Sequence, residues 1–191
     1  MAVALSLAAM RPGSAQPVHT FVDPIDQQPR DCYAAPKAGG AQVLVRGRSS
    51  NTLRFWAYST WDGSGQPMMI FNPAALAQVA PIVTRFAFYH ECAHLVLRST
   101  DELQANCEAL KRMRARRELA AGDEATLKQE HYRLTGLGQQ YLGTGKALWD
   151  ATISCANTSN ANASETRSTS PAGYSYRSAP ALVTGRSRDK P

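Results

Sequence analysis

The stretch His90-Glu91-Cys92-Ala93-His94 constrains this chain more than any other feature, because it lies inside a run with helical periodicity. Apolar residues recur at three- and four-residue spacing between residues 81 and 97, which predicts a helix with one buried face. Histidines four residues apart lie on the same helical face, one turn apart, so both imidazoles can reach one metal ion. Glu91 lies about 100° round the helix, near enough to contact a water on that ion. The stretch therefore predicts two metal ligands and a base, and a third ligand must come from elsewhere.

The acidic segment that follows makes the chain resemble the gluzincin zinc peptidases. In that family a downstream helix carries Glu-x-x-Ala-Asp, and its Glu is the third zinc ligand. The matching residues here are Glu102, Ala105 and Asn106. The resemblance implies one zinc ion per chain bound by His90, His94 and Glu102, with Asn106 accepting a hydrogen bond from a zinc-bound imidazole. It covers about residues 67–110.

Other assignments of the third ligand stay open at this point. Glu102 lies three residues after Ser99, where it could close a capping box instead of binding a metal. Only seven residues separate His94 from Glu102, which is short for a reversal between two helices. The other candidate ligands are Glu108, Asp101 and His131.

An intact site of this kind predicts hydrolysis of a peptide or protein substrate. Zinc lowers the pKa of a bound water toward 7, and Glu91 would act as general base for attack on a carbonyl that the metal polarises. The resemblance implies an edge strand that pairs with the extended substrate; residues 68–71 are the candidate, with a plain core strand as the alternative. Candidates for stabilising the oxyanion are His131, Tyr132, Arg133 and Tyr141.

Two other functions stay open. A catalytically inactive zincin-fold protein, acting in binding or assembly, is favoured by Asn106 in place of the usual Asp and by the short linker. A cytosolic peptidase that cleaves a regulator is the second, and reduced cysteines would favour it.

The order of the expected elements predicts an α+β fold in which a small antiparallel sheet precedes the helices. β-Branched and aromatic content predicts strands, and helical spacing with Asn72 as an N-cap predicts helices. The expected strands are 42–46, 53–58 and 67–71, with a turn at 47–51. The expected helices are 73–79, 81–97, 101–119 and 123–142, the third capped by Ser99 or Thr100. The resemblance implies that these helices form a zincin core.

Composition divides the chain into three parts. Residues 1–15 are apolar and end in small residues, which predicts a signal peptide. Residues 16–155 form the expected domain, and 156–191 are a polar tail expected to be disordered. The net charge is +6, but the basic cluster at 111–117 is typical of a solvated helix face, so a nucleic-acid partner is not expected. No apolar run reaches the roughly 18 residues of a membrane-spanning helix.

The four cysteines suit a disulfide-bearing domain in the periplasm or outside the cell. They allow three pairings, and we expect Cys92 to pair with Cys107 and Cys32 with Cys155. Free thiols in a cytoplasmic protein are the alternative. A four-cysteine zinc site is disfavoured because the sequence has no CxxC pair.

Overall fold

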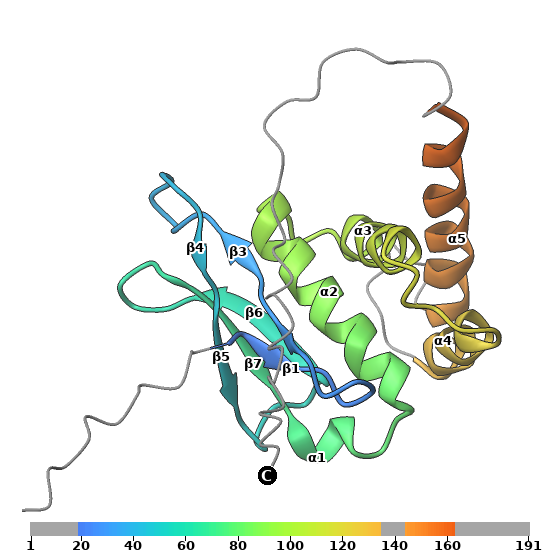
Figure 1. The fold of residues 1–191 in the computed structure, drawn as a ribbon, viewed down its shortest axis with the longest axis horizontal. Coiled ribbons are helices and arrows are strands. Elements are labelled where there is room, and N and C mark those ends of the chain that lie inside the picture. Colours follow the sequence, from blue (N-terminus) through green and yellow to red (C-terminus); the bar gives the residue numbers. More distant parts are fainter. Residues whose placement is uncertain (1–18, 135–143, 163–191) are drawn as a thin grey trace, which may run out of the picture.

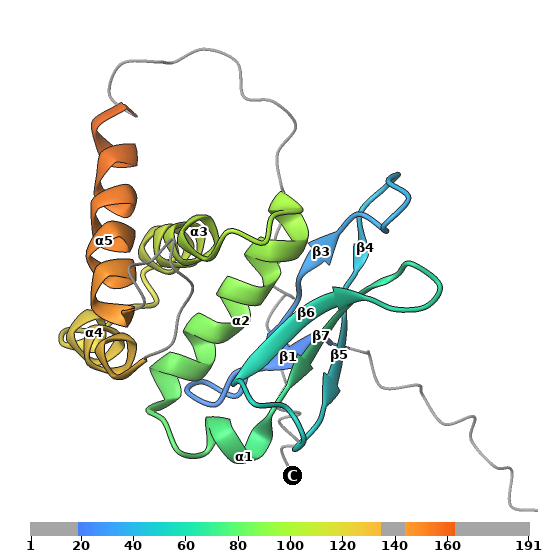
Figure 2. The same cartoon turned by 180° about the vertical axis from the view of Figure 1, so that it is seen from behind.

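A computed structural model describes residues 19–134 and 144–162, with short strands on one side of a central helix and three helices on the other (Figures 1 and 2). The strands are β1 (Phe21–Val22), β2 (Pro29–Arg30), β3 (Tyr33–Ala34), β4 (Val43–Leu44), β5 (Arg46–Ser49), β6 (Ala57–Trp61) and β7 (Pro67–Phe71). The helices are α1 (Pro73–Leu76), α2 (Pro81–Leu97), α3 (Glu102–Ala115), α4 (Asp123–Arg133) and α5 (Gly145–Asn162). This order confirms the α+β class.

The main sheet has three strands in the order β5-β7-β6, and it is mixed, not antiparallel as expected. β6 and β7 form an antiparallel hairpin, while β5 runs parallel to β7. The expectation was wrong because β7 inserts between the two earlier strands, and β5 also occupies part of the expected turn at 47–51. Residues 68–71 therefore lie in the central strand, and the proposed edge strand was misassigned.

β6 lies at the edge of this sheet and packs against α2 (Figure 1). The Trp56 carbonyl accepts a hydrogen bond from Asn72 N, and Asp62 N donates to Gln66 O, both at 2.8 Å. Hydrogen-bonding groups alternate sides along an antiparallel pair, so the odd-numbered residues of β6 direct their N–H and C=O away from β7. Pro67, which has no N–H, accordingly stands opposite Trp61. No strand of the described residues pairs with this side of β6, so its free edge is formed by Ala57, Ser59 and Trp61, and the Trp61 carbonyl accepts a hydrogen bond from the Thr60 hydroxyl at 3.4 Å.

α2 matches the helix predicted at 81–97 residue for residue. Pro81 occupies its first turn, where the missing N–H has no helical partner, and the helix ends at Arg98 in a left-handed conformation. Most of α2 is buried, with Phe88 and Tyr89 each 1% exposed. The helix is therefore a rigid support for the side chains along its length.

A buried ion network joins α2 to the β1–β2 hairpin. The Arg30 and Arg85 Nε atoms each donate to Asp23 Oδ2 at 2.6 Å, and the Asp23 side chain is fully buried. Burial alone would raise the pKa of Asp23, but the hydrogen bonds from Arg85 and Arg30 hold it below its ordinary value. The paired charges fix the hairpin against the first half of α2.

The later helices differ from expectation at their ends. α3 ends at residue 115 and not at 119. α4 ends at residue 133, and residues 135–142 of the expected helix lie outside the described part. α5 was not predicted, although Leu148, Trp149 and Thr152 bury one face of it. This helix continues to Asn162, past the boundary expected at residue 155.

All four cysteines form disulfides, but not in the expected pairs. Cys32 bonds Cys92 and Cys107 bonds Cys155, each with Cα atoms 5.9 Å apart. Cys92 lies about 200° round α2 from either histidine, so it faces the strands and cannot reach α3. Cys107 faces α5 instead. The disulfides indicate an oxidising compartment, extracellular or periplasmic.

The expected signal peptide at 1–15 and most of the expected tail lie outside the described residues. Of the helices that are described, none combines the length and apolar character needed to cross a membrane.

Candidate metal centre

The site lies where α3 folds back against α2. Arg98 ends α2 with a φ of 53°, and Asp101 caps α3 by accepting a hydrogen bond from Gln104 N at 3.0 Å. The Ser99 hydroxyl accepts a hydrogen bond from Asp101 N at 3.1 Å. This tight reversal explains how seven linker residues suffice. Because the cap is Asp101 and not Ser99, Glu102 begins the helix and its carboxylate faces the histidines.

Three side chains converge at this point: His90, His94 and Glu102. The two histidine Nε2 atoms are 3.0 Å apart. Glu102 Oε2 lies 3.1 Å from His90 Nε2 and 3.7 Å from His94 Nε2. One ligand atom from each residue therefore lies close enough to the others for the group to hold a metal ion.

The far side of each imidazole is held by an oxygen. His90 Nδ1 donates to Asn106 Oδ1, and His94 Nδ1 donates to the Ser99 carbonyl, both at 2.7 Å. Because these oxygens accept hydrogen bonds, each neutral ring carries its proton on Nδ1 and a lone pair on Nε2. Two lone pairs then face each other, an arrangement that needs a cation between them.

The electrostatics of the three donors favour a positive charge at their centre. Burial lowers the pKa of His94, but hydrogen bonds to Glu102 and the Ser99 carbonyl raise it above its ordinary value overall. Burial likewise raises the pKa of Glu102, yet its hydrogen bonds to both histidines hold it far below the usual range. Glu102 is thus an ionised carboxylate facing two imidazoles, and a proton or a metal ion can supply the positive charge.

Glu91 is buried beside the donors without being one of them. Its side chain belongs to a residue only 8% exposed, and its charge contributes to raising the pKa of His94. The role of Glu91 as a general base stays a prediction.

The other candidate ligands are engaged elsewhere. Glu108 Oε1 accepts a hydrogen bond from Arg112 Nε at 2.5 Å, and Asp101 caps α3. The His131 ring is buried between Phe86 and Trp149, and its Nδ1 donates to the Leu127 carbonyl at 2.8 Å. These three residues are not part of the cluster.

The four candidates for stabilising an oxyanion are outside the donor cluster or outside the described residues. Tyr132 donates its hydroxyl to Asp150, and Arg133 pairs with Glu130 on the surface. Tyr141 lies outside the described residues. The pKa of His131 is lowered to about 4, chiefly by burial; a charge on His90 acts in the same direction, and the hydrogen bond to the Leu127 carbonyl acts against both. His131 is therefore neutral at physiological pH and within electrostatic reach of the site.

No sequence pattern could indicate the Ser99 carbonyl, because every residue carries a carbonyl and only the reversal between α2 and α3 directs this one at His94. Asn106 was expected to accept a hydrogen bond from an imidazole. Its amide nitrogen is a second feature of the site. Its Nδ2 is buried and has no hydrogen-bond partner among the described residues. An unpaired buried donor costs about 1–3 kcal/mol.

Asn106→Asp should tighten metal binding by about tenfold. The substitution removes the unpaired donor and places a negative charge on the oxygen that accepts the His90 Nδ1 proton, which makes Nε2 more basic. Competition against a chromophoric chelator at fixed pH measures the affinity. Asn106→Ala serves as the opposite control and should weaken binding by at least tenfold. Equal affinities in all three proteins would show that Asn106 does not support the metal.

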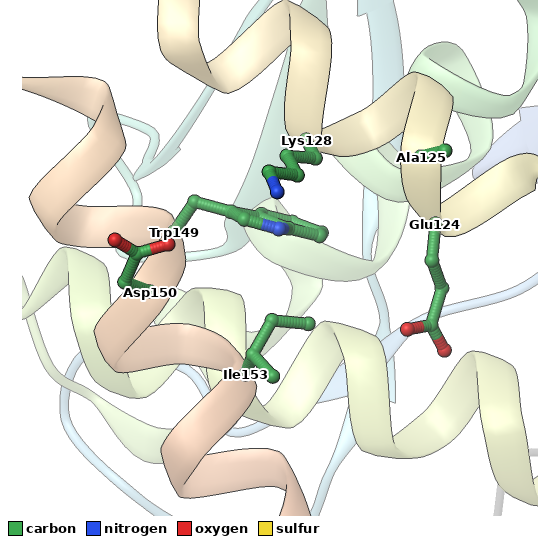
Figure 3. A pocket seen from close by; sticks show the side chains of 6 residues that line it. All are labelled: Glu124, Ala125, Lys128, Trp149, Asp150 and Ile153. Carbon is green, nitrogen blue, oxygen red and sulfur yellow. The ribbon is translucent and has the colours of Figure 1, made fainter.

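A surface cavity of about 320 Å³ lies away from the metal site, between α4 and α5 (Figure 3). It is lined by Glu124, Ala125, Lys128, Trp149, Asp150 and Ile153. Glu124 is paired with Arg114, and Asp150 with Lys146. Its carboxylates are thus neutralised, and the cavity offers no comparable set of reactive groups.

Comparison with family models, curated proteins and solved structures finds no match.

Proposed function

We propose that this chain is a zinc-dependent hydrolase that cleaves peptide bonds, a small metallopeptidase of the gluzincin type. The observation that carries the proposal is the pair of histidine Nε2 atoms facing Glu102, with both Nδ1 protons held by oxygens on the far side. A carboxylate and two neutral imidazoles are a donor set found in catalytic zinc sites, which keep a fourth position for water.

The spacing of the donors supports zinc. Ligand atoms about 2.0–2.2 Å from a tetrahedral ion are about 3.3–3.5 Å from one another. The three separations, 3.0, 3.1 and 3.7 Å, lie on either side of that value. Softer ions such as Cu(I) prefer sulfur, and the four cysteine sulfurs are held in disulfides.

Zinc at this position would lower the pKa of a bound water toward 7 and polarise a substrate carbonyl. Glu91 would accept the proton of that water and pass it to the leaving amine. His90, His94 and Glu102 would hold the ion and leave a fourth position for the reacting groups.

The free edge of β6 supports an extended peptide as substrate. Ala57, Ser59 and Trp61 offer N–H and C=O groups along a strand that packs against α2. An extended peptide can add to such an edge as a further strand, with its backbone aligned beside α2. Together with the disulfides and the expected signal peptide, this favours a peptidase acting in the periplasm or outside the cell.

A zinc-binding protein without turnover is the second candidate. Asn106 favours this second candidate. An uncharged amide makes the His90 imidazole a less basic ligand than the Asp found at this position in the resembled family would make it. The same metal site would then serve binding or assembly, and Glu91 would have no proton to transfer.

Metal content, measured by mass spectrometry on protein purified without added zinc, tests the proposal. We expect about one zinc per wild-type chain, and loss of most of it in His94→Ala and in Glu102→Ala, since either change leaves two protein ligands. Glu108→Ala is the matched control, because this glutamate lies on the same helix and pairs with Arg112. It should keep its zinc. A wild-type protein that takes up no metal even when zinc is supplied would overturn the enzyme and the binding protein alike.

A further inference from the structure

Two basic residues, Arg98 and Lys37, contact each other where β6 ends, through the Arg98 guanidinium and the Lys37 backbone. Arg98 Nη2 donates to the Lys37 carbonyl at 2.5 Å, and Lys37 N donates to the Gly65 carbonyl at 2.8 Å in the turn that follows β6. Within residues 19–134 and 144–162, neither side chain forms an ion pair, and both residues are exposed. The positive charge at this end of the strand is therefore not neutralised by a carboxylate of the described chain.

The Arg98 side chain is held in place. Its guanidinium lies 5.8 Å from the centre of the Trp61 ring, and Trp61 Nε1 donates to the Ala35 carbonyl at 3.2 Å. Within the described residues, Nη2 is the one guanidinium nitrogen that forms a hydrogen bond, and this bond uses one of its two hydrogens. The second Nη2 hydrogen and the N–H group beside it can donate to an additional acceptor. An arginine oriented in this way can bind a carboxylate through two parallel hydrogen bonds.

The backbone of Arg98 gives a second argument. Its φ of 53° is a left-handed conformation that glycine adopts without strain and that usually ends helices. An L-residue with a Cβ costs about 1–2 kcal/mol there. A glycine would end α2 at a lower conformational cost. We therefore expect the Arg98 side chain to make an interaction that a glycine cannot make.

The position of this pair relates it to the metal site. Arg98 follows His94 by one helical turn, and the Trp61 ring below its guanidinium belongs to the last residue of β6. Trp61 is also one of the residues whose N–H and C=O form the free edge. A peptide lying along that edge from the metal site would end beside Arg98 and Lys37.

We propose that Arg98 and Lys37 form a carboxylate-binding subsite, and that the chain prefers extended peptides with an acidic residue beside Trp61. The inference rests on the proposed function, because it takes the free edge of β6 as the peptide site. It adds the chemical class of one substrate side chain.

Calorimetric titration of the zinc-loaded Glu91→Gln protein tests the subsite without turnover. The probes are decapeptides of fixed neutral sequence in which one Glu, or Gln as its isostere, is moved along the chain. At one position we expect Glu to bind about 5- to 20-fold more tightly than Gln at low ionic strength. Added salt should reduce the preference, because the cations are exposed.

The preference should disappear in Arg98→Gln and decrease in Lys37→Gln, while affinity for the Gln peptides stays the same. Arg48→Gln is the matched control, because this exposed arginine lies on β5 at the opposite edge of the sheet. It should keep the preference. If Arg98→Gln weakens both peptides equally, Arg98 has only a structural role and the subsite is overturned.

The outcomes also separate the two proposals. Wild-type affinity that is equal for Glu and Gln at every position would overturn the subsite and leave the peptidase standing. Absence of binding by any peptide to zinc-loaded protein would overturn the peptide substrate, and the subsite with it.

Discussion

Replacing Glu91 with Gln should lower kcat for peptide hydrolysis by at least about 1,000-fold, while the zinc content stays at the wild-type level. The amide has nearly the shape of the carboxylate but cannot accept the proton of the attacking water. Glu91 is not among the three donors that face the metal position, so its loss leaves the ligand set intact. A quenched-fluorescent peptide library gives the rate, and mass spectrometry gives the metal content.

Glu108→Gln is the control for this measurement, because it removes the same charge from a glutamate that pairs with Arg112. Its activity should stay within twofold of wild type, a small effect expected of a surface substitution. A Glu91→Gln protein that keeps a tenth or more of the activity would show that another group accepts the proton. A wild-type protein that binds zinc but cleaves nothing in the library would favour the binding or assembly function.

Removal of the Cys32–Cys92 disulfide by a Cys32→Ser/Cys92→Ser double substitution should lower the free energy of unfolding by about 4 kcal/mol. The bond closes a loop between cysteines 60 residues apart, so its loss lets the unfolded chain gain considerable conformational entropy. Both cysteines are fully buried, and the bond joins the segment between β2 and β3 to α2. Urea unfolding followed by circular dichroism measures the change.

The Cys107→Ser/Cys155→Ser protein is the comparison, with a separation of 48 residues and a similar expected loss. Only the first double substitution frees the α2 segment between the two histidines from the strands, so it should reduce metal affinity more. A loss of stability below about 1 kcal/mol for Cys32→Ser/Cys92→Ser would contradict the entropic argument.

Local patterns allowed a good part of this molecule to be predicted. α2 could be bounded because Pro81 and the apolar spacing act within the helix itself. The convergence of the histidines with Glu102 was implied by the family resemblance, and the structure brings these side chains together. Asn106 lies one turn after Glu102, so it could be expected on the same face.

Interactions between distant segments were harder to predict. The position of β7 between β5 and β6 depends on how three strands associate, and alternation within one strand does not encode that order. The disulfide partners of Cys92 and Cys107 depend on which helical face each occupies in the folded molecule. α5 was missed because its polar, Ser- and Asn-rich second half concealed the helical spacing of the buried residues Leu148, Trp149 and Thr152.

The pairing of the cysteines has a consequence for how the chain is made. The bonds join the first cysteine to the second and the third to the fourth, in the order in which they are synthesised. Each native bond can therefore form as soon as its second cysteine emerges, before the next one appears. An oxidant that joins successive thiols suffices, and no isomerase is needed to reshuffle them. The first bond can close before Glu102 has emerged, which would anchor α2 to the strands before Glu102 joins the two histidines.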